Sequence, residues 1–478
     1  MQLSRAKVLN DDEIKKIHNA SMEILSETGV HIKSRNALLF LEGKGLKVDH
    51  DKYIVKFNPE IVKKAIESTP EEFELFSRDK SYSFKIGVDN TTRTAAGHNG
   101  IYTYDYKKKT RVPTTKEEVG IFARLSNYLD DIDIVATQAM PNDVDSKSSL
   151  LHGVDAVLNN TIKPILFSPE KKIEIESIIE MIKIVIDSDN INIKPIGICQ
   201  FSPSSPLFWN ADTIDGFMKI AKEGFPCTIL PGPIMGATAP YTIAGELIQK
   251  NCEILSGVVV AQLVNRGTPL LYCNSGVQFD MKSAAAIFST PECFIINVAG
   301  TQLAQFYNIP THGCIPTSDS HDHDEQLGFE NMLSYLSGFE SGTSLLVNAG
   351  MFSSGKVSSF EQLIIDNEII KVVRKYLRGV EINSETMAID AIKRIGPMGN
   401  FLSDESTLKS LRSGKFSESD IINRKEYRVW LNDGSRTIVE NAAEKVKRML
   451  KSIDTPVLEK DKRKKISKII NDFEKRYK

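Results

Sequence analysis

The chain has 478 residues, and its 60 basic and 62 acidic side chains leave a formal net charge of −2. This balance gives no reason to expect a nucleic-acid partner. The apolar runs are shorter than a membrane span, residues 1–10 lack a signal-peptide core, and the six cysteines lack CxxC spacing. We therefore expect a cytoplasmic protein with reduced cysteines and no membrane contact.

Residues 1–90 are predicted to form an N-terminal, mainly helical extension. Asp11 and Asp12 can cap a first amphipathic helix, because short acidic side chains accept hydrogen bonds from free backbone N–H groups. A second helix is expected over residues 61–68, and short strands around residues 73–84.

Residues 91–402 contain short apolar runs that alternate with helical stretches. Such runs are typical of parallel strands buried on both faces. Eight strand–helix units predict an α/β fold, a (β/α)8 TIM barrel, with an open doubly wound sheet as the alternative. The expected strands cover residues 94–104, 132–140, 164–167, 195–201, 227–230, 270–273, 310–314 and 344–349.

Residues 403–478 are predicted to form a C-terminal helical extension. The stretch over residues 461–478 is rich in lysine and carries an apolar stripe that includes Ile466, Ile470 and Phe473. This spacing predicts an amphipathic helix whose charged face lies in solvent.

Residues 231–263 contain a strand end, a loop rich in glycine and proline, and an amphipathic helix. Such a loop lets backbone approach a ligand closely, but its spacing is not that of a nucleotide-binding loop. Residues 350–356 fit G-x-x-x-x-G-K, yet Val357 stands where a phosphate-binding loop needs serine or threonine. Nucleotide binding is therefore not predicted.

The loops that follow several expected strands are rich in aromatic and hydroxyl side chains. In a barrel these loops carry the chemistry, and aromatic faces attract a quaternary ammonium. The alternative is that these rings only pack the top of the barrel. The predicted substrate-binding residues are His98, Phe208, Trp209, Asn274, Phe279, His312 and Phe352.

Several segments together resemble the trimethylamine methyltransferase family. They are GHNGIYTYD (97–105), CQFSPSSPL (199–207), the loop and helix over 231–263, FEQLIIDNEI (360–369) and GNFL (399–402). The resemblance implies transfer of a methyl group from an amine to the cobalt of a corrinoid (cobalamin) carried by a separate partner protein.

One departure from that family concerns the substrate. The trimethylamine enzymes have a Ser-pyrrolysine-Ser-Asp loop, and the matching residues here run from Pro316 to Asp319, with Thr317 at the pyrrolysine position. The chain therefore resembles the branch without pyrrolysine, whose members act on glycine betaine, proline betaine or carnitine. Thr317, Asp319 and Gln326 are the predicted catalytic residues, with Thr317 as a wall of the pocket. Asp319 and Gln326 are expected either beside the ammonium or ordering the loop.

A quaternary ammonium already carries the charge that makes a neutral tertiary amine a good leaving group, so no general acid is required. His312, Cys314, His321 and His323 have metal-ligand side chains within a short span. Because a quaternary amine has no lone pair for zinc, no metal of its own is expected. Two alternatives stay open: a zinc-dependent enzyme for another methyl donor, and a non-catalytic betaine-binding protein. We also expect a homo-oligomer.

Overall fold

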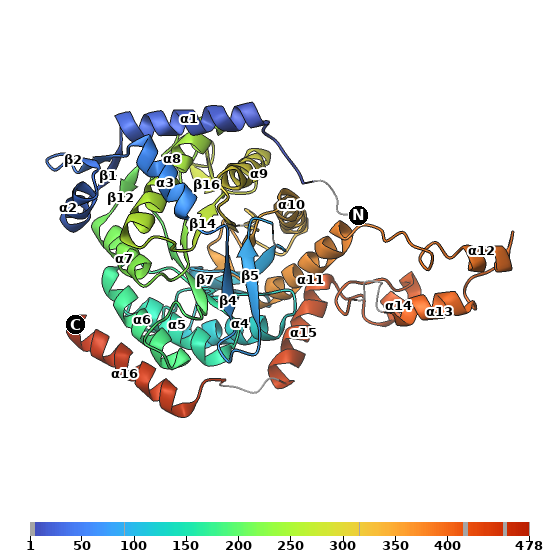
Figure 1. The fold of residues 1–478 in the computed structure, drawn as a ribbon. Coiled ribbons are helices and arrows are strands. Elements are labelled where there is room, and N and C mark those ends of the chain that lie inside the picture. Colours follow the sequence, from blue (N-terminus) through green and yellow to red (C-terminus); the bar gives the residue numbers. More distant parts are fainter. Residues whose placement is uncertain (1–4, 90, 315, 414–418, 453–456, 478) are drawn as a thin grey trace.

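The chain folds around a barrel of eight parallel strands surrounded by helices (Figure 1). The computed structural model describes residues 5–89, 91–314, 316–413, 419–452 and 457–477. The barrel strands are β6 (Arg93–Ala96), β9 (Val135–Ala136), β10 (Ile165–Phe167), β11 (Gly197–Phe201), β13 (Cys227–Ile229), β14 (Leu270–Cys273), β17 (Thr311–Cys314) and β18 (Leu345–Ala349). The outer helices are α4 (Lys116–Tyr128), α5 (Ser149–Asn160), α6 (Lys172–Ile186), α7 (Ala211–Lys222), α8 (Ile243–Val264), α9 (Pro291–Phe306), α10 (Glu325–Ser341) and α11 (Phe360–Leu377). The barrel predicted from the apolar runs is confirmed.

The barrel closes between β6 and β9, where a parallel bridge joins Ala95 to Ile134. The expected strand over residues 94–104 is in fact two strands, β6 and β7 (Tyr102–Asp105). The break begins at Gly97, where a Cβ atom would lie only 2.2 Å from the side chain of Met351. Glycine is therefore the residue that fits at the point where the chain leaves the barrel wall after β6.

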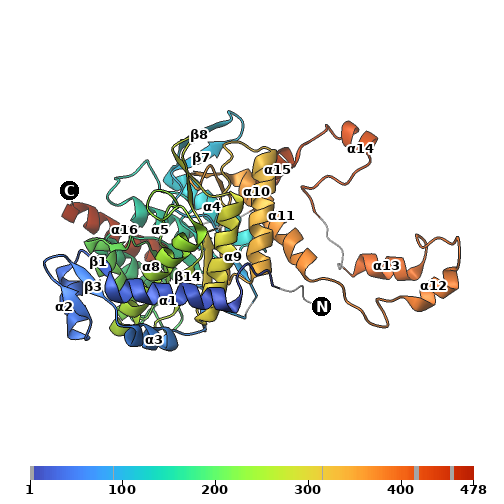
Figure 2. The ribbon, with the colours of Figure 1, turned by 90° about the horizontal axis from the view of Figure 1, so that it is seen from above.

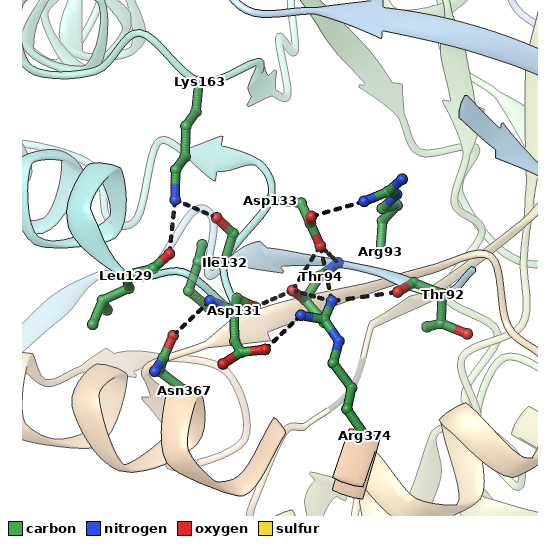
Figure 3. Close-up of polar contacts among 10 residues, drawn as sticks. All are labelled: Thr92, Arg93, Thr94, Leu129, Asp131, Ile132, Asp133, Lys163, Asn367 and Arg374. Carbon is green, nitrogen blue, oxygen red and sulfur yellow. Dashed lines mark hydrogen bonds and ion pairs between the residues drawn. The ribbon is translucent and has the colours of Figure 1, made fainter. Parts of the chain in front are cut away.

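A charged cluster supports this seam at the end of the barrel where the strands begin (Figure 3). Arg374 of α11 donates to Asp131 (2.7 Å) and Asp133 (3.0 Å), and Arg93 donates to Asp133 (3.2 Å). Lys163 donates to backbone carbonyls of the last turn of α4 and of the segment between α4 and β9, at 2.6–2.9 Å. In a TIM barrel this end serves stability rather than chemistry.

A hairpin of β4 (Glu72–Phe76) and β5 (Ser83–Gly87) closes the same end of the barrel, and Figure 1 shows it lying across the barrel. Its side chains Phe73, Leu75, Phe84 and Ile86 pack with the inward-facing apolar residues of the barrel strands. A ligand can therefore reach the interior only from the opposite end, where the strands finish.

The N-terminal extension adds a small sheet to the predicted helices. It contains α1 (Asp11–Glu27), β1 (Val30–Ile32), α2 (Arg35–Gly43), β2 (Lys47–Asp49), β3 (Ile54–Lys56) and α3 (Pro59–Ser68). The cap of α1 is Asn10, which accepts from the backbone of Asp12 and Glu13, rather than the predicted aspartates. A strand that follows β11, β12 (Phe208–Trp209), pairs with β1 and ties the extension to the barrel.

Helix α8 is long and apolar enough to cross a membrane by length and composition, which differs from the expectation that all apolar runs are too short. In the fold, 78% of its most apolar window is buried. It packs with α1, α3 and α7, so its composition is that of a core helix.

Short strands form the rim at the carboxyl end of the barrel. They are β7, β8 (Thr110–Pro113), β15 (Gln278–Asp280), β16 (Ala285–Ile287), β19 (Met351–Phe352) and β20 (Val357–Ser358). The G-x-x-x-x-G-K segment lies in the β19–β20 hairpin. It therefore does not open a helix as a phosphate-binding loop does.

The C-terminal part consists of α12 (Ile389–Ile395), α13 (Glu405–Arg412), α14 (Tyr427–Asn432), α15 (Ile438–Ser452) and α16 (Lys460–Tyr477). Helix α16 packs on α5 and α6 and buries Ile466, Ile470 and Phe473, as its apolar stripe predicts. Figure 2 shows α12, α13 and α14 projecting away from the barrel.

Candidate functional site

Inward-facing side chains change from apolar to polar toward the carboxyl ends of the barrel strands. Residues such as Ile134, Leu166 and Ile198 form an apolar layer inside the barrel. Because alternate strand residues share a face, positions two residues further along point inward again. This alternation gives a polar layer of Gln138, Ser168, Gln200, Thr228, Cys273 and His312. Asn348 joins the layer because the register of β18 shifts between Leu346 and Ala349, and its side chain lies beside His98.

Two imidazoles stand at the centre of this layer, His312 fully buried and His98 partly buried. His98 and His312 have ring centroids 6.4 Å apart. Burial lowers the pKa of His98 to about 4 and that of His312 to about 3. His312 Nδ1 lies 2.9 Å from the hydroxyl of Thr228. Both rings are uncharged at neutral pH, so neither repels a cationic ligand.

Thr317 joins this centre through Asn348. The Asn348 side-chain nitrogen lies 3.1 Å from Thr317 Oγ1, and its oxygen lies 3.1 Å from His98 Nδ1. The Thr317 hydroxyl also donates to the carbonyl of Cys314 (2.9 Å). Asn348 has φ of 93°, a conformation that asparagine adopts more readily than most residues. The sequence analysis therefore predicted two members of one hydrogen-bonded group, His98 and Thr317. It did not predict Asn348, the residue that joins them.

Asp319 holds three rim segments together. Its carboxylate accepts from the backbone of Phe288 (3.0 Å) and Ser289 (2.9 Å) and from the hydroxyl of Ser354 (2.8 Å). Its own N–H donates to the buried carboxylate of Glu330 (3.0 Å). Asp319 was expected either to lie beside the substrate ammonium or to order the loop, and this geometry favours the second role.

Gln326 lies on the first turn of α10 with its side chain exposed, and it donates to Glu330 (2.9 Å). Ser318 donates to the same carboxylate at 2.5 Å. Glu330 is thus a shared acceptor, and Gln326 reaches the loop only through it.

A cavity of about 650 Å³ opens beside the polar layer at the ends of β10 and β11. Asn99, Ser168 and Gln200 line it, and Lys33 stands on its wall. The buried side-chain oxygens of Asn99 and Ser168 have no hydrogen-bond partner among the described residues. Unpaired buried acceptors are costly, so they indicate a place for a bound group.

Trp209 lies away from this cavity. Its ring is fully buried, stacks on Phe217 of α7 (centroids 5.4 Å apart), and donates to Ser256 of α8 (3.0 Å). Phe208 meets His31 of β1 edge-on, with centroids 5.1 Å apart. Because β12 is recruited by the N-terminal sheet, both rings serve packing, and this position argues against a contact with a ligand at the strand ends.

Asn274 also points away from the interior. Its amide donates to Thr301 of α9 (2.6 Å) and to Thr343 before β18 (3.2 Å), between the barrel wall and the helices. Phe279 lies partly exposed on β15, in the rim. The structure therefore does not bring either residue together with His98 and His312 in one hydrogen-bonded group.

Phe352 is buried in a separate aromatic group behind the rim. Its ring lies 5.3 Å from Tyr104 and 5.4 Å from His323, measured between centroids. Tyr104 lies within hydrogen-bond distance of Asp322 (2.5 Å), so this group links β7 to the loop that carries Thr317. Its position supports the loop that forms one wall of the site.

The four residues with metal-ligand side chains fall into three places. His312 Nε2 lies 3.4 Å from Cys314 Sγ, His321 contacts Ser353 (2.7 Å), and His323 contacts Ser359 (3.2 Å). Among the described residues no three histidine, cysteine, aspartate or glutamate side chains converge as metal ligands. The expectation that the protein needs no metal of its own stays a prediction.

The sequence reasoning missed Asn348, Gln138 and Thr228. Each is a polar residue within or shortly after an otherwise apolar strand, and such a break in an apolar run can be recognised in the sequence. Which of several such residues faces inward depends on strand register, and register was not assigned from the apolar pattern.

Comparisons with known proteins place the chain in a family. The family model described as "Trimethylamine methyltransferase (MTTB)" matches residues 1–477. Trimethylamine methyltransferase MttB of Desulfitobacterium hafniense is 29% identical over 98% of this chain and 94% of its own. The glycine betaine methyltransferase of Desulfitobacterium hafniense is 28% identical over 91% and 90%.

A similar solved structure shares the fold. The monomethylamine methyltransferase of Methanosarcina barkeri covers 93% of this chain and 89% of its own, with a TM-score of 0.55 and 13% identity. The match to the family model spans nearly the whole chain, so this protein belongs to the trimethylamine methyltransferase family.

Proposed function

We propose that this methyltransferase takes a methyl group from a quaternary amine and transfers it to the cobalt of a corrinoid protein. The observation that carries the proposal is an uncharged centre: the neutral imidazole of His98, joined to Thr317 through Asn348, with the neutral imidazole of His312 beside it. Thr317 stands where the trimethylamine enzymes have pyrrolysine. The similarity to a glycine betaine methyltransferase supports the same substrate class.

The chemistry fits such a centre. When a corrinoid partner is bound, cobalt(I) supplies the nucleophile, and the amine leaves as a neutral tertiary amine. The protein therefore needs to hold one methyl group in line and to exclude water, rather than to move a proton. We assign substrate contact to His98, His312 and Thr317, and positioning of the loop to Asp319 and Gln326.

The cavity offers acceptors that suit polarised methyl groups. The side-chain oxygens of Asn99 and Ser168 can accept weak C–H hydrogen bonds, each contributing about 0.5–1 kcal/mol. Lys33 and Lys171 stand on the cavity wall with Glu170 and Asp212, so the rim is nearly balanced in charge. A balanced rim suits a zwitterion such as a betaine better than a simple cation or anion.

A ligand screen separates this proposal from its alternatives. Thermal unfolding is measured with glycine betaine, proline betaine, carnitine, choline and trimethylamine, because a ligand that binds the folded state raises its stability. We expect a betaine to raise the midpoint most. A betaine that stabilises the protein while no methyl transfer follows would favour a binding protein, and a rise only with trimethylamine would overturn the substrate class.

A further inference from the structure

Two sequence motifs that the proposed function leaves unexplained meet at the end of β18. One is the segment FEQLIIDNEI (360–369) at the start of α11, and the other is the turn that begins at Gly350. Asp366, within the helix segment, is fully buried, and its Oδ2 accepts from the backbone N–H of Gly350 at 2.7 Å. The carboxylate therefore joins an outer helix of the barrel to the strand end that carries Asn348.

The carboxylate of Asp366 accepts three hydrogen bonds. Its Oδ1 accepts from the side-chain nitrogens of Gln362 on the same helix (2.8 Å) and Asn331 on α10 (2.9 Å). Burial raises the pKa of Asp366 to about 7, and the three donors oppose this rise because they favour the charged form. Such a set of donors suits a side chain that only accepts, and it orients one carboxylate oxygen toward Gly350.

The backbone at the end of β18 needs such an anchor. Asn348 has φ of 93° and Gly350 has φ of 85°, and the register between β18 and β6 shifts here. A residue other than glycine keeps a positive φ only where its surroundings hold it. The carbonyl of Ala349 accepts from the N–H of Gly97 in the barrel wall (2.9 Å). Asp366 supplies the second anchor, from the helix layer outside the barrel.

We propose that Asp366 is a positioning residue, which fixes this turn so that the side chain of Asn348 reaches both His98 and Thr317. This role rests on the proposed function, because it concerns how two residues assigned to the substrate are held. Asp366 acts through the backbone rather than on the substrate itself. A misplacement of about 1 Å in a reacting centre can lower a rate by about 100-fold, so a distant anchor can matter for catalysis.

Two variants of Asp366 separate this role from its alternative, a contribution to stability alone. Asp366→Leu has a similar size and no acceptor, so the N–H of Gly350 loses its partner. Asp366→Asn retains one oxygen for Gly350. The side-chain oxygen of Asn331 has no hydrogen-bond partner among the described residues, so this amide can turn to accept from the new NH2 group. We therefore expect Asp366→Asn to keep the geometry of the turn.

Asp155→Leu is the matched control. Asp155 is a buried carboxylate on another outer helix, α5, and accepts from Lys116 (2.7 Å) and Asn159 (2.8 Å). Helix α5 packs against α4 and α6. Its loss should lower the free energy of unfolding without altering the turn at Gly350. Comparison with Asp366→Leu therefore separates positioning from a general loss of stability.

The measurement is the Nδ1–H signal of His98 in NMR spectra of the full chain with isotope-labelled histidine, at about pH 8, where Asp366 is charged. This proton is hydrogen-bonded to Asn348 and so protected from exchange, and its signal is assigned by its loss in His98→Gln. We expect the signal in the wild type, Asp366→Asn and Asp155→Leu, and its loss in Asp366→Leu. In that variant alone, kcat/KM should fall by about tenfold or more.

Retention of the signal in Asp366→Leu, or its loss with kcat/KM unchanged, would overturn the proposal. Loss of the signal in Asp155→Leu would do the same, because any missing buried carboxylate would then have this effect. The signal does not depend on the methyl donor, so a failure of the proposed function leaves this result distinct.

A second variant applies if circular dichroism shows that Asp366→Leu does not fold. Adding Asn331→Leu and Gln362→Leu removes the side-chain donors together with their acceptor, and such a joint replacement by apolar groups can be nearly neutral. The N–H of Gly350 still lacks its acceptor in this triple variant. The same loss of the His98 signal is therefore expected, and its retention would contradict the assigned role.

Discussion

The Nδ1 atom of His98 lies 3.1 Å from the side-chain oxygen of Asn348, and the direction of this hydrogen bond follows from its neighbours. A backbone carbonyl can only accept, so the Thr317 hydroxyl donates to Cys314 and accepts from the Asn348 nitrogen. The Asn348 oxygen therefore faces His98 and accepts its Nδ1–H. This leaves Nε2 of a neutral His98 as an acceptor toward the site.

The first prediction concerns this chain of hydrogen bonds. Asn348→Asp keeps the shape and tolerates the positive φ, but a carboxylate cannot donate to Thr317, and its charge should raise the pKa of His98. We expect kcat/KM to fall by about tenfold, which corresponds to losing one buried hydrogen bond. We also expect a new inflection near neutral pH in the plot of kcat/KM against pH, because His98 would then titrate in that range. The pH profile of initial rates measures both effects.

The control is Asn190→Asp, an exposed loop residue far from the site in sequence. It should leave the profile unchanged. An Asn348→Asp profile that matches the wild type would show that the hydrogen-bond direction is wrong.

The second prediction concerns stability against acid. Burial lowers the pKa of His98 to about 4, below its ordinary value of 6.5, so the unfolded state binds a proton more readily. The stability contributed by neutral His98 is complete above about pH 6.5 and is lost as pH falls toward 4. Urea unfolding at several pH values should show this decline.

His98→Gln removes one titrating group and should make the decline shallower. His50→Gln, at an exposed site with a pairing carboxylate in Glu42, serves as the control because its ring is not buried. Equal slopes for the wild type and His98→Gln would contradict the assigned neutral imidazole.

The third prediction concerns Asp319. Asp319→Asn retains one acceptor oxygen, so part of its contact with Phe288, Ser289 and Ser354 is lost. Hydrogen bonds to a charged group contribute about 1.5–3 kcal/mol each, so the rim loop should loosen and KM should rise more than kcat falls. Steady-state kinetics separate the two constants.

Asp79→Asn is the comparison, since Asp79 makes similar contacts with Ser77 and Ser81 on the hairpin at the closed end of the barrel. Asp79→Asn should lower the free energy of unfolding and leave both kcat and KM unchanged. If Asp319→Asn lowered kcat and left KM unchanged, Asp319 would instead act on the reacting groups.

The fourth prediction concerns Lys33, which the N-terminal extension places on the cavity wall. Lys33→Met should raise KM for glycine betaine by about fivefold, the effect of losing roughly 1 kcal/mol from an exposed ion pair. Binding of choline, which lacks the carboxylate, should not change. Lys63→Met on the exposed face of α3 is the control. If Lys33→Met weakened the binding of glycine betaine and choline equally, Lys33 would not be the residue that contacts the betaine carboxylate.

The strands of the barrel could be predicted from sequence because strands buried on both faces are almost continuously apolar. The apolar runs near residues 227–230 and 270–273 coincide with β13 and β14 nearly residue for residue. The cap of α1 was misplaced by one residue, because asparagine and aspartate are equally good caps.

The site was predicted only in part, and the reason is long-range pairing. Trp209 follows a barrel strand, yet β12 pairs with β1, a segment that lies far earlier in the chain. No local pattern reports such a pairing. Asn274 follows β14 directly but faces outward, because neighbouring residues of an extended strand alternate between the two faces and Cys273 before it faces inward.

The measurement that tests the central claim most directly is methylation of cob(I)alamin, followed by its visible absorbance, with each candidate methyl donor in turn. We expect transfer from at least one betaine and none from trimethylamine, because the neutral centre around His98 and Thr317 offers nothing to activate a tertiary amine. The His98→Gln variant should transfer more slowly, while His50→Gln should match the wild type. Robust turnover of trimethylamine with no turnover of any betaine would contradict the account.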